Sequence, residues 1–375
     1  MRILMVNLPF AGHTNPTLPL AKALAAAGHE VTYINAECMR SRIEATGAAF
    51  LPYRDYPAEP TEDQKKKDSF RACWDTAMRM KGQVDLLIYE MFFYPGFTLA
   101  ERLGVPCVRQ WSQPAWSVEG WLKRPFRFRM AAQLLDQQIM SEDDRRYMGQ
   151  NDRSLSGAGM NDRPALNIAY LPEAMQDCRG DFGDDYVFAV LPPTEDAAQD
   201  DFLPWAELKR PIVYVSMGSI MSDCGFCRQV VKGLGGRDMT VILNTGRIDP
   251  ASLGKLPANV RAYAFVPQVQ VLRHADVFAT HCGMNSANEA LAAGVPMVCL
   301  PVMNDQIGNA ARLVELGVGR RISPFLMSGK KLLAAVQGVW QDEGMRRKAA
   351  ALKERLRGQQ DVATLVKRIE AVMEA

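Results

Sequence analysis

Residues 265–310, FVPQVQVLRHADVFATHCGMNSANEALAAGVPMVCLPVMNDQIGNA, decide the fold of this chain. The apolar run at 277–280 is typical of a buried parallel strand, and GVPMVCLPV at 294–302 predicts a second one. A polar turn, HCGMNS, and a helix-forming stretch, ANEALAA, lie between them. This order of strand, turn, helix and strand predicts a parallel α/β sheet.

The turn between the first strand and the helix carries groups that bind phosphate. Gly283 lets an anion approach the backbone, and the first N–H groups of the helix would point at it. His281 would add a ring N–H donor. We expect Asn285 and Ser286 to act as cap-type side chains ahead of the helix and to donate as well. Several neutral donors would then converge on one anion, and a pyrophosphate would fit there.

Three polar residues after this turn suit the ribose and the hexose of a nucleotide sugar. Glu289 lies one helical turn after Asn285, on the same face, where its carboxylate could accept from a pair of ribose hydroxyls. Asp305 and Gln306 follow the carboxyl end of the second strand, where open α/β sheets present their ligand-binding loops. A carboxylate beside an amide suits a polyol such as a hexose.

The overall composition is that of a soluble globular protein. The chain has 375 residues, enough for two domains, and 48% of them are hydrophobic and 23% charged. A net charge of +2 gives no reason to expect a nucleic-acid partner. No run of about 18 apolar residues predicts a membrane span, and the opening residues read as a strand rather than a signal peptide. The eight scattered cysteines are typical of reduced thiols, so we expect a cytoplasmic protein.

One cysteine pair, Cys224-Gly-Phe-Cys227, could indicate a metal or redox site. A structural zinc site would need a second pair or nearby histidines, and none of the four histidines is close in sequence. Metal or redox use therefore stays the minor alternative for this pair. The chain also has no Asp-x-Asp, P-loop or GxGxxG pattern, which disfavours metal-dependent sugar transfer, P-loop hydrolysis and dinucleotide binding.

Strands and helices alternate along both halves of the chain, which predicts doubly wound parallel sheets. A helix is expected at 16–27, with Asn15 as its cap, and the tail from 342 onward is expected to be helical throughout. The Pro-rich and acidic stretch at 190–205 reads as an interdomain linker. The remaining strands are predicted at 3–8, 30–35, 48–53, 84–90, 106–111, 211–219, 240–246 and 260–266.

Two stretches, 54–80 and 112–165, interrupt this alternation. They are rich in Trp, Phe, Met and basic residues, and they could line an acceptor cleft or simply pack against the sheet. For the basic and aromatic segment 121–130, contact with a membrane surface is a further, weaker alternative.

The stretch at 265–310 resembles the donor-binding signature of family 1 glycosyltransferases, the UDP-dependent enzymes that include plant natural-product and bacterial macrolide glucosyltransferases. In that family an aromatic residue stacks on the uracil, followed by a Pro-Gln pair, a His-x-Gly-x-Asn-Ser phosphate loop, a Glu for the ribose and an acidic residue with Gln for the sugar. Each slot is filled in order, by Phe265 (where plant enzymes usually have Trp), Pro267, Gln268, His281, Gly283, Asn285, Ser286, Glu289, Asp305 and Gln306.

The resemblance implies the GT-B fold, in which two Rossmann-like domains face each other and the last helix crosses back to the first domain. It implies an acceptor-binding domain at 1–200 with the helix at 356–375, and a nucleotide-sugar domain at 206–355. The segment Gly12-His13-Thr14-Asn15-Pro16 resembles the amino-terminal loop of the family. We add Gly12, Ser219 and Val266 to the expected donor contacts.

In the family this loop carries the general base, which here is His13, and an Asp orients it. The matching position after DLLIY is Glu90, so the chain departs from the family there. The longer side chain could loosen the pair, or the backbone could compensate. Acceptors with acidic hydroxyls, such as phenols, would suffer least from a loose pair.

The sequence therefore predicts a metal-independent, inverting transferase that moves a hexose, most simply glucose, from a UDP-sugar to a small lipophilic acceptor. The nucleotide sugar is a co-substrate, and no cofactor is expected. TDP- and GDP-sugars stay open as donors. A UDP-sugar epimerase or hydrolase on the same fold, and a catalytically silent relative that acts as a binding partner, are the alternatives.

Overall fold

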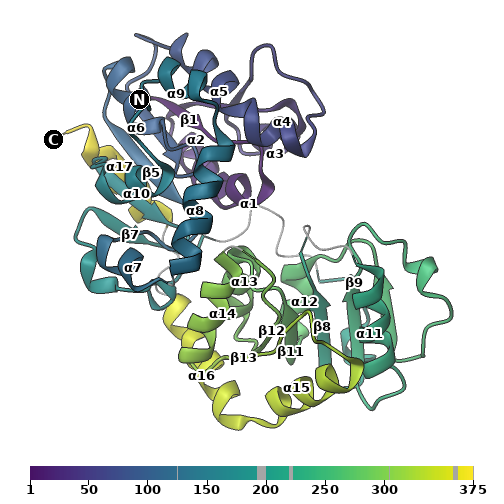
Figure 1. Ribbon diagram of the computed structural model, residues 1–375. Coiled ribbons are helices and arrows are strands. Elements are labelled where there is room, and N and C mark those ends of the chain that lie inside the picture. Colours follow the sequence, from purple (N-terminus) through teal and green to yellow (C-terminus); the bar gives the residue numbers. More distant parts are fainter. Residues whose placement is uncertain (125, 192–199, 219–222, 304, 358–361, 375) are drawn as a thin grey trace. The chain divides into compact units, whose positions relative to one another are not determined.

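The computed structural model describes residues 1–124, 126–191, 200–218, 223–303, 305–357 and 362–374. The chain divides into two compact units, of which the first comprises Met1–Thr194 with Gln360–Ala375 and the second Glu195–Gln359. Each unit is built on one parallel sheet flanked by helices (Figure 1). The predicted α/β class with two parallel sheets is confirmed. The roles expected for the two domains stay predictions.

The first unit has a seven-stranded sheet in the order β3-β2-β1-β4-β5-β6-β7. Its central strands are apolar on both faces because helices cover both, as parallel sheets require. β6 and β7, at one edge, were not among the predicted strands. The strands are β1 (Arg2–Val6), β2 (Glu30–Asn35), β3 (Ala49–Pro52), β4 (Leu86–Glu90), β5 (Cys107–Trp111), β6 (Leu166–Ala169) and β7 (Tyr186–Phe188).

The two stretches that interrupt the alternation fold as helices. The stretch at 54–80 supplies α4 and α5, and the stretch at 112–165 supplies α7 to α10. The helices of this part of the chain are α1 (Ala11–Thr14), α2 (Leu18–Ala26), α3 (Arg40–Glu44), α4 (Glu62–Lys67), α5 (Ser69–Met78), α6 (Gly96–Leu103), α7 (Val118–Lys123), α8 (Phe126–Ile139), α9 (Glu142–Tyr147) and α10 (Leu155–Asn161).

The helix predicted at 16–27 is shorter, and a helical turn precedes it. α1 runs into a 3₁₀ turn at Asn15–Thr17 before α2 begins at Leu18. The N-cap residue of α2 is Thr17, without a side-chain cap hydrogen bond, so the prediction of Asn15 as the cap is wrong. His13 consequently lies within a helical turn, which holds its backbone more firmly than an open loop would.

The second unit has a six-stranded sheet in the order β10-β9-β8-β11-β12-β13. The predicted strand at 260–266 ends earlier, and the short edge strand β13 was not predicted. The strands are β8 (Ile212–Ser216), β9 (Thr240–Asn244), β10 (Val260–Tyr263), β11 (Val277–Thr280), β12 (Met297–Cys299) and β13 (Gly319–Arg321). The helices are α11 (Cys224–Leu234), α12 (Gln268–His274), α13 (Met284–Ala293), α14 (Asp305–Glu315), α15 (Gly329–Gln341) and α16 (Glu343–Arg357).

The helical tail consists of two helices in its described part, α16 and α17 (Val362–Val372). α17 packs on α2 of the first unit, and Leu365, Val366 and Ile369 are buried in the core of that unit. The His29 ring lies 3.1 Å from the Glu370 carboxylate, Nε2 to Oε1. The expectation that the last helix returns to the first domain is confirmed.

Candidate active-site residues

His13 and Glu90 come together at the carboxyl edge of the first sheet. Glu90 is the last residue of β4, and β1, which pairs with β4, leads into the turn that carries His13. Nδ1 of His13 lies 3.0 Å from Oε1 of Glu90. The Glu90 side chain is fully buried, whereas the His13 ring is 26% exposed. The longer Glu side chain thus reaches the imidazole at hydrogen-bond distance, and solvent reaches the ring.

Ser112 completes this cluster and was not found by sequence reasoning. It follows β5, the neighbour of β4, and its Oγ lies 2.8 Å from Oε1 of Glu90 and 2.9 Å from Nδ1 of His13. A single serine among many carries no sequence signal. The available clue was its position directly after a predicted strand, at the edge where the other two residues were expected.

Aromatic rings and a buried polar network hold His13 in place. The Phe92 ring stacks on the imidazole with centroids 5.0 Å apart and planes at 29°. Beneath the turn, Nδ2 of Asn7 donates to the His13 carbonyl at 3.3 Å and to the Tyr33 hydroxyl at 2.6 Å. The Tyr33 hydroxyl also lies 2.6 Å from Thr17 Oγ1. Burial raises the pKa of Tyr33 well above its usual range, so this network stays uncharged.

His281 in the second unit lies between β11 and α13 and is buried, with 6% of its surface exposed. Burial lowers its pKa to about 4, so the ring is neutral at pH 7. Two glycines leave space for the His281 ring because they have no side chain. A Cβ on Gly283 would lie 2.5 Å from Nε2, and a Cβ on Gly218 would lie 2.6 Å from Cε1. Nδ1 has no hydrogen-bond partner within the described residues, so the ring retains hydrogen-bonding capacity.

α13 begins directly after this turn, with Gly283 as its N-cap residue and no side-chain cap. Asn285 and Ser286 lie inside the first turn of the helix, so the prediction that they precede it is wrong. The helix starts earlier because Gly283 takes the cap position, at φ −59° and ψ 144°, without a side-chain hydrogen bond. The first N–H groups of α13 lack the intrahelical acceptors of later turns, as an anion site requires.

A chain of hydrogen bonds links Gln268 to the first turns of α13. Nε2 of Gln268 lies 3.1 Å from Oγ of Ser286 and 2.7 Å from Oε2 of Glu289. The Tyr214 hydroxyl donates to Oε1 of the Gln268 side chain at 3.2 Å. Three residues expected to contact one nucleotide are therefore mutual neighbours in the folded unit.

Phe265 and Val266, two further residues expected to contact the donor, differ in exposure. The Phe265 ring is 72% exposed, which suits stacking on a base. Val266 is buried, so its side chain cannot touch a ligand and only its backbone could. In the first unit, Gly12 lies within α1 next to His13, and a Cβ there would meet nothing within 4 Å. Ser219 lies outside the described residues.

Asp305 and Gln306 begin α14, where side-chain hydrogen bonds fix them. Oε1 of Gln306 accepts from the backbone N–H groups of Val302 and Met303, at 3.0 and 3.2 Å. Nδ2 of Asn309 donates to Oδ2 of Asp305 at 2.9 Å and to the Cys282 carbonyl at 3.0 Å. Asn309 thereby ties the sugar-binding candidates to the turn after β11. Sequence reasoning did not find it, because an Asn inside a helix carries no local signal.

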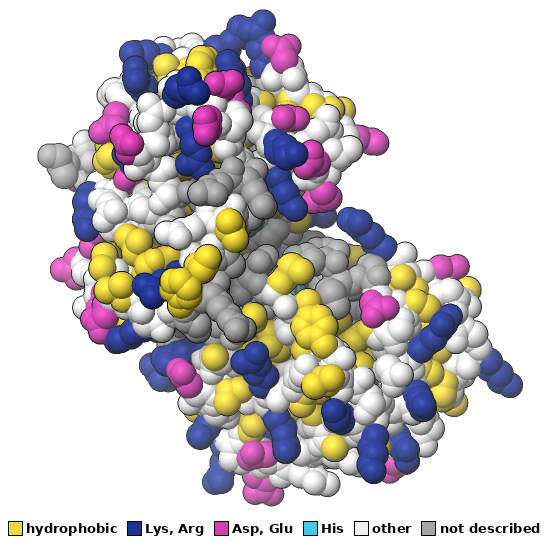
Figure 2. Space-filling model, viewed as in Figure 1, with side chains coloured by type: hydrophobic (Ala, Val, Ile, Leu, Met, Phe, Trp, Pro, Cys, Tyr) yellow, Lys and Arg dark blue, Asp and Glu magenta, His cyan; other side chains and the backbone are white. Residues whose placement is uncertain are grey.

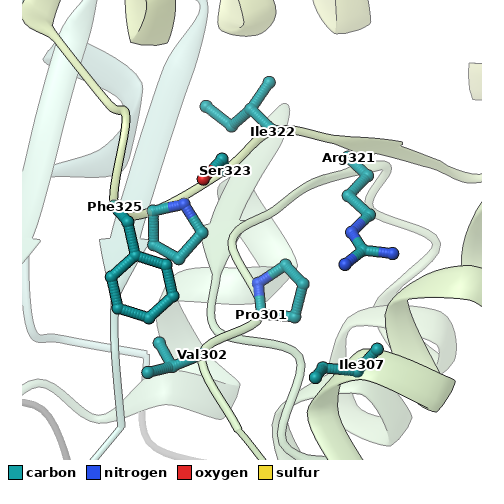
Figure 3. A pocket seen from close by; sticks show the side chains of 8 residues that line it. Pro301, Val302, Ile307, Arg321, Ile322, Ser323 and Phe325 are labelled. Carbon is teal, nitrogen blue, oxygen red and sulfur yellow. The ribbon is translucent and has the colours of Figure 1, made fainter.

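An open pocket of about 400 Å³ lies beside these residues in the second unit. Figure 3 shows Phe325 and Arg321 on opposite sides of Pro301, with Ile307 of α14 below. Val302, whose backbone N–H donates to Gln306, forms part of its wall. None of the predicted donor residues lines this pocket.

Among the described residues, the charged side chains and the cysteines are candidates for a second site. Figure 2 shows basic and acidic side chains interspersed over the described atoms of the visible face. All eight cysteines are free thiols, with Cys227 buried in α11. In the described part of the chain, no cluster of three His, Cys, Asp or Glu side chains could hold a metal ion. No described helix is long and apolar enough to cross a membrane.

Comparison with known proteins relates the chain to sugar-transferring enzymes. Residues 205–373 match the family model described as UDP-glucoronosyl and UDP-glucosyl transferase. The NDP-glycosyltransferase YjiC of Bacillus subtilis (strain 168) is 30% identical over 357 residues, which cover 91% of this chain and 89% of that protein.

Solved structures agree with this relationship. The glycotransferase of kitacinnamycin superposes with a TM-score of 0.81 at 27% identity, over 99% of this chain and 98% of that one. A spinosyn rhamnosyltransferase complexed with thymidine diphosphate has the same fold, with a TM-score of 0.73 at 21% identity over 99% and 100% of the two chains. The chain therefore belongs to family 1 of the UDP-dependent glycosyltransferases, has their GT-B fold and is an enzyme that transfers a glycosyl group from a nucleotide sugar.

Proposed function

We propose that this glycosyltransferase moves a hexose, with inversion, from a UDP-sugar to a hydroxyl of a small lipophilic acceptor, and that His13 is the general base. The observation that carries this proposal is the His13–Glu90 pair, 3.0 Å between Nδ1 and Oε1 at the carboxyl edge of the first sheet. A carboxylate on one ring nitrogen orients the imidazole and leaves the other nitrogen to take a proton. Proton removal of this kind contributes ~10²–10⁴-fold to rate.

These roles account for the proton that is transferred and for the bonds that form and break. His13 takes the proton of the acceptor hydroxyl while the oxygen attacks the anomeric carbon. The bond from that carbon to the nucleoside diphosphate breaks, and the diphosphate leaves with the electron pair. Attack on the face opposite the leaving group inverts the anomeric configuration, so an α-linked donor would give a β-linked product.

For the second unit we propose the role of donor domain, with the turn after β11 binding the diphosphate. Neutral His281, Gly283 and the uncapped start of α13 can together donate to an anion without adding a fixed positive charge. Asn285 and Ser286 would contribute from the first turn. Phe265 would stack on the base, Gln268 and Glu289 would contact the nucleoside, and Asp305 and Gln306 the sugar.

A TDP-sugar is the second candidate donor, favoured by the structural relative that holds thymidine diphosphate. Thermal unfolding with UDP, TDP, GDP and UDP-glucose, each at saturating concentration, separates these possibilities. A ligand at about one hundred times its dissociation constant adds ~2.7 kcal/mol of stability, which gives a shift of several degrees. We expect UDP and UDP-glucose to stabilise the protein most. A larger shift with TDP would move the assignment to TDP-sugars, and no shift with any nucleotide would overturn the donor site.

The acceptor role of the first unit needs a separate test. With the best donor, transfer to a panel of phenols and aliphatic alcohols should depend on His13 and be lost in His13→Ala. Release of the sugar to water at the same rate with and without an acceptor would instead favour the hydrolase alternative.

A further inference from the structure

Ser112 occupies an unusual place beside the proposed base. Its Oγ, Nδ1 of His13 and Oε1 of Glu90 form a closed triangle with sides of 2.8, 2.9 and 3.0 Å. The serine side chain is buried, and its backbone N–H also points at Oε1 of Glu90, at 3.4 Å. One carboxylate oxygen thus faces three potential donors, two from Ser112 and one from His13.

With Glu90 ionised, the triangle favours one placement of protons. Glu90 Oε1 is an acceptor when ionised, so the hydroxyl hydrogen of Ser112 points at it. If Nδ1 of His13 lacked a hydrogen, its lone pair would face both this carboxylate oxygen and the serine oxygen, and the three would repel one another. A hydrogen on Nδ1 satisfies both oxygens. In the neutral ring Nε2 is then the basic nitrogen, as proton removal from an acceptor requires.

The remaining oxygen of Glu90 is fixed from the other side. Oε2 accepts from the backbone N–H of Phe92 at 2.9 Å. Glu has one more rotatable bond than Asp, so its carboxylate needs additional restraint to stay on the imidazole. Ser112 and the Phe92 backbone hold one oxygen each and supply this restraint.

We propose that Ser112 is a positioning residue of the reaction: it anchors the Glu90 carboxylate and thereby holds in place the group that favours the Nδ1–H tautomer of His13. The inference rests on the proposed function of His13. Ser112 need not touch either substrate, because it acts on the base through Glu90 and Nδ1.

Kinetics of Ser112→Ala and Ser112→Thr provide the first test. Loss of one buried hydrogen bond to a charged group should lower kcat about tenfold, with the KM for the nucleotide sugar unchanged. Ser112→Thr keeps the hydroxyl and should recover most of the loss. Thr46→Val is the matched control. Thr46 is also a buried hydroxyl, but it precedes β3, the outermost strand on the far side of β1 from β5. The kcat of Thr46→Val should equal that of the wild type.

The tautomer of His13 provides a readout that needs no turnover. The chain has four histidines, so ¹⁵N-histidine labelling gives a simple spectrum in which His13→Ala assigns the His13 signals. In the neutral ring we expect a protonated Nδ1 in the wild type. In Ser112→Ala the Glu90 carboxylate loses its anchor on Oε1, and we expect the Nε2–H tautomer to be populated as well. Thermal unfolding of each variant confirms that it is folded.

The outcomes separate this inference from the proposed function. An Nε2–H tautomer in the wild type, or an unchanged tautomer and kcat in folded Ser112→Ala, would overturn the role of Ser112. If Ser112→Ala shifts the tautomer while His13→Ala still transfers sugar normally, Ser112 positions His13 as inferred but His13 is not the base.

Discussion

At the scale of single residues, Glu90 shows how a longer side chain can orient a histidine. The carboxylate is fully buried at the end of β4, and contacts to His13, Ser112 and the Phe92 backbone use both of its oxygens. Burying a carboxylate is unfavourable unless hydrogen bonds compensate it, and these contacts do so. The loose pair considered from the sequence is therefore not what the folded protein contains.

Substitution of Glu90 should affect acceptors according to the acidity of their hydroxyl. Glu90→Ala removes the partner of Nδ1, and we expect kcat to fall ~10²-fold or more for an aliphatic alcohol, within the range for base catalysis. A phenol, with a pKa near 10, needs less help from a base and should lose less. Glu90→Asp should lie between wild type and alanine, because the carboxylate withdraws by about one C–C bond, ~1.5 Å. Equal losses on the two acceptor classes would contradict this prediction.

His281 should make the stability of the protein depend on pH. Burial lowers its folded pKa to about 4, against about 6.5 for an unfolded histidine. Between these values the unfolded chain binds a proton that the folded protein does not, so stability falls as the pH falls from 6.5 to 4. The full effect is about 3 kcal/mol.

Urea unfolding at pH 7 and pH 5 measures this dependence. Gln cannot bind a proton in this pH range. The free energy of unfolding of His281→Gln should therefore fall less between pH 7 and pH 5 than that of the wild type. The same pH dependence in wild type and variant would show that the ring is not buried as neutral imidazole.

At the scale of elements, the start of α13 combines three features in a few residues. Gly283 caps the helix without a side chain, Cys282 before it has a positive φ of 65°, and His281 packs against the glycine. A non-glycine residue at positive φ is strained, and Asn309 of α14 holds its carbonyl in place. The turn is thus shaped by contacts from a neighbouring helix as well as by its own sequence.

Gly283→Ala should weaken nucleotide binding more than it weakens the fold. The added Cβ would lie 2.5 Å from Nε2 of His281, so the ring must move away from its present position. We expect the dissociation constant for the preferred nucleoside diphosphate to rise at least tenfold, about 1.4 kcal/mol, in isothermal titration. Gly180→Ala is a matched control, because its Cβ would meet nothing within 4 Å. Equal affinity in the two variants would argue against a phosphate site at this turn.

At the scale of the whole molecule, the chain ends in the unit where it began. α17 completes the hydrophobic core of the first unit, whereas α16 belongs to the second. The two units therefore cannot be separated by a single cut in the chain without removing part of the first core.

Ile369→Ala tests this connection. Ile369 is fully buried against the core that α2 covers. Its truncation should lower the free energy of unfolding of the first unit by about 2–5 kcal/mol, the usual cost of such a cavity. Denaturant unfolding followed with and without saturating nucleotide shows which unit is affected. Lys367→Ala, on the exposed face of α17, should have little effect. A loss of nucleotide affinity in Ile369→Ala would contradict the assignment of α17 to the first unit.

Much of the fold was predictable because its signals are local. Buried parallel strands such as β4 and β11 appear as short apolar runs, and helix-forming stretches separate them. The edge strand β13, with the sequence GRR, has no such signal, because two of its three residues are exposed. Both α2 and α13 begin away from the predicted caps: α2 follows a 3₁₀ turn, and Gly283 takes the cap position of α13.

The sequence by itself determined the two parallel sheets, and its resemblance to the family supplied the order of the expected donor residues and the expectation that a carboxylate after β4 pairs with His13. The sheets follow from local patterns, and the rule that parallel strands present their carboxyl ends at one edge places His13 and Glu90 at the same edge. Only the tertiary structure decided that Glu90 reaches Nδ1, that Ser112 joins them, that Asn309 ties two loops together and that His281 is buried neutral. These features depend on strand register and on contacts between residues far apart in the chain, for which hydrophobic periodicity carries no information.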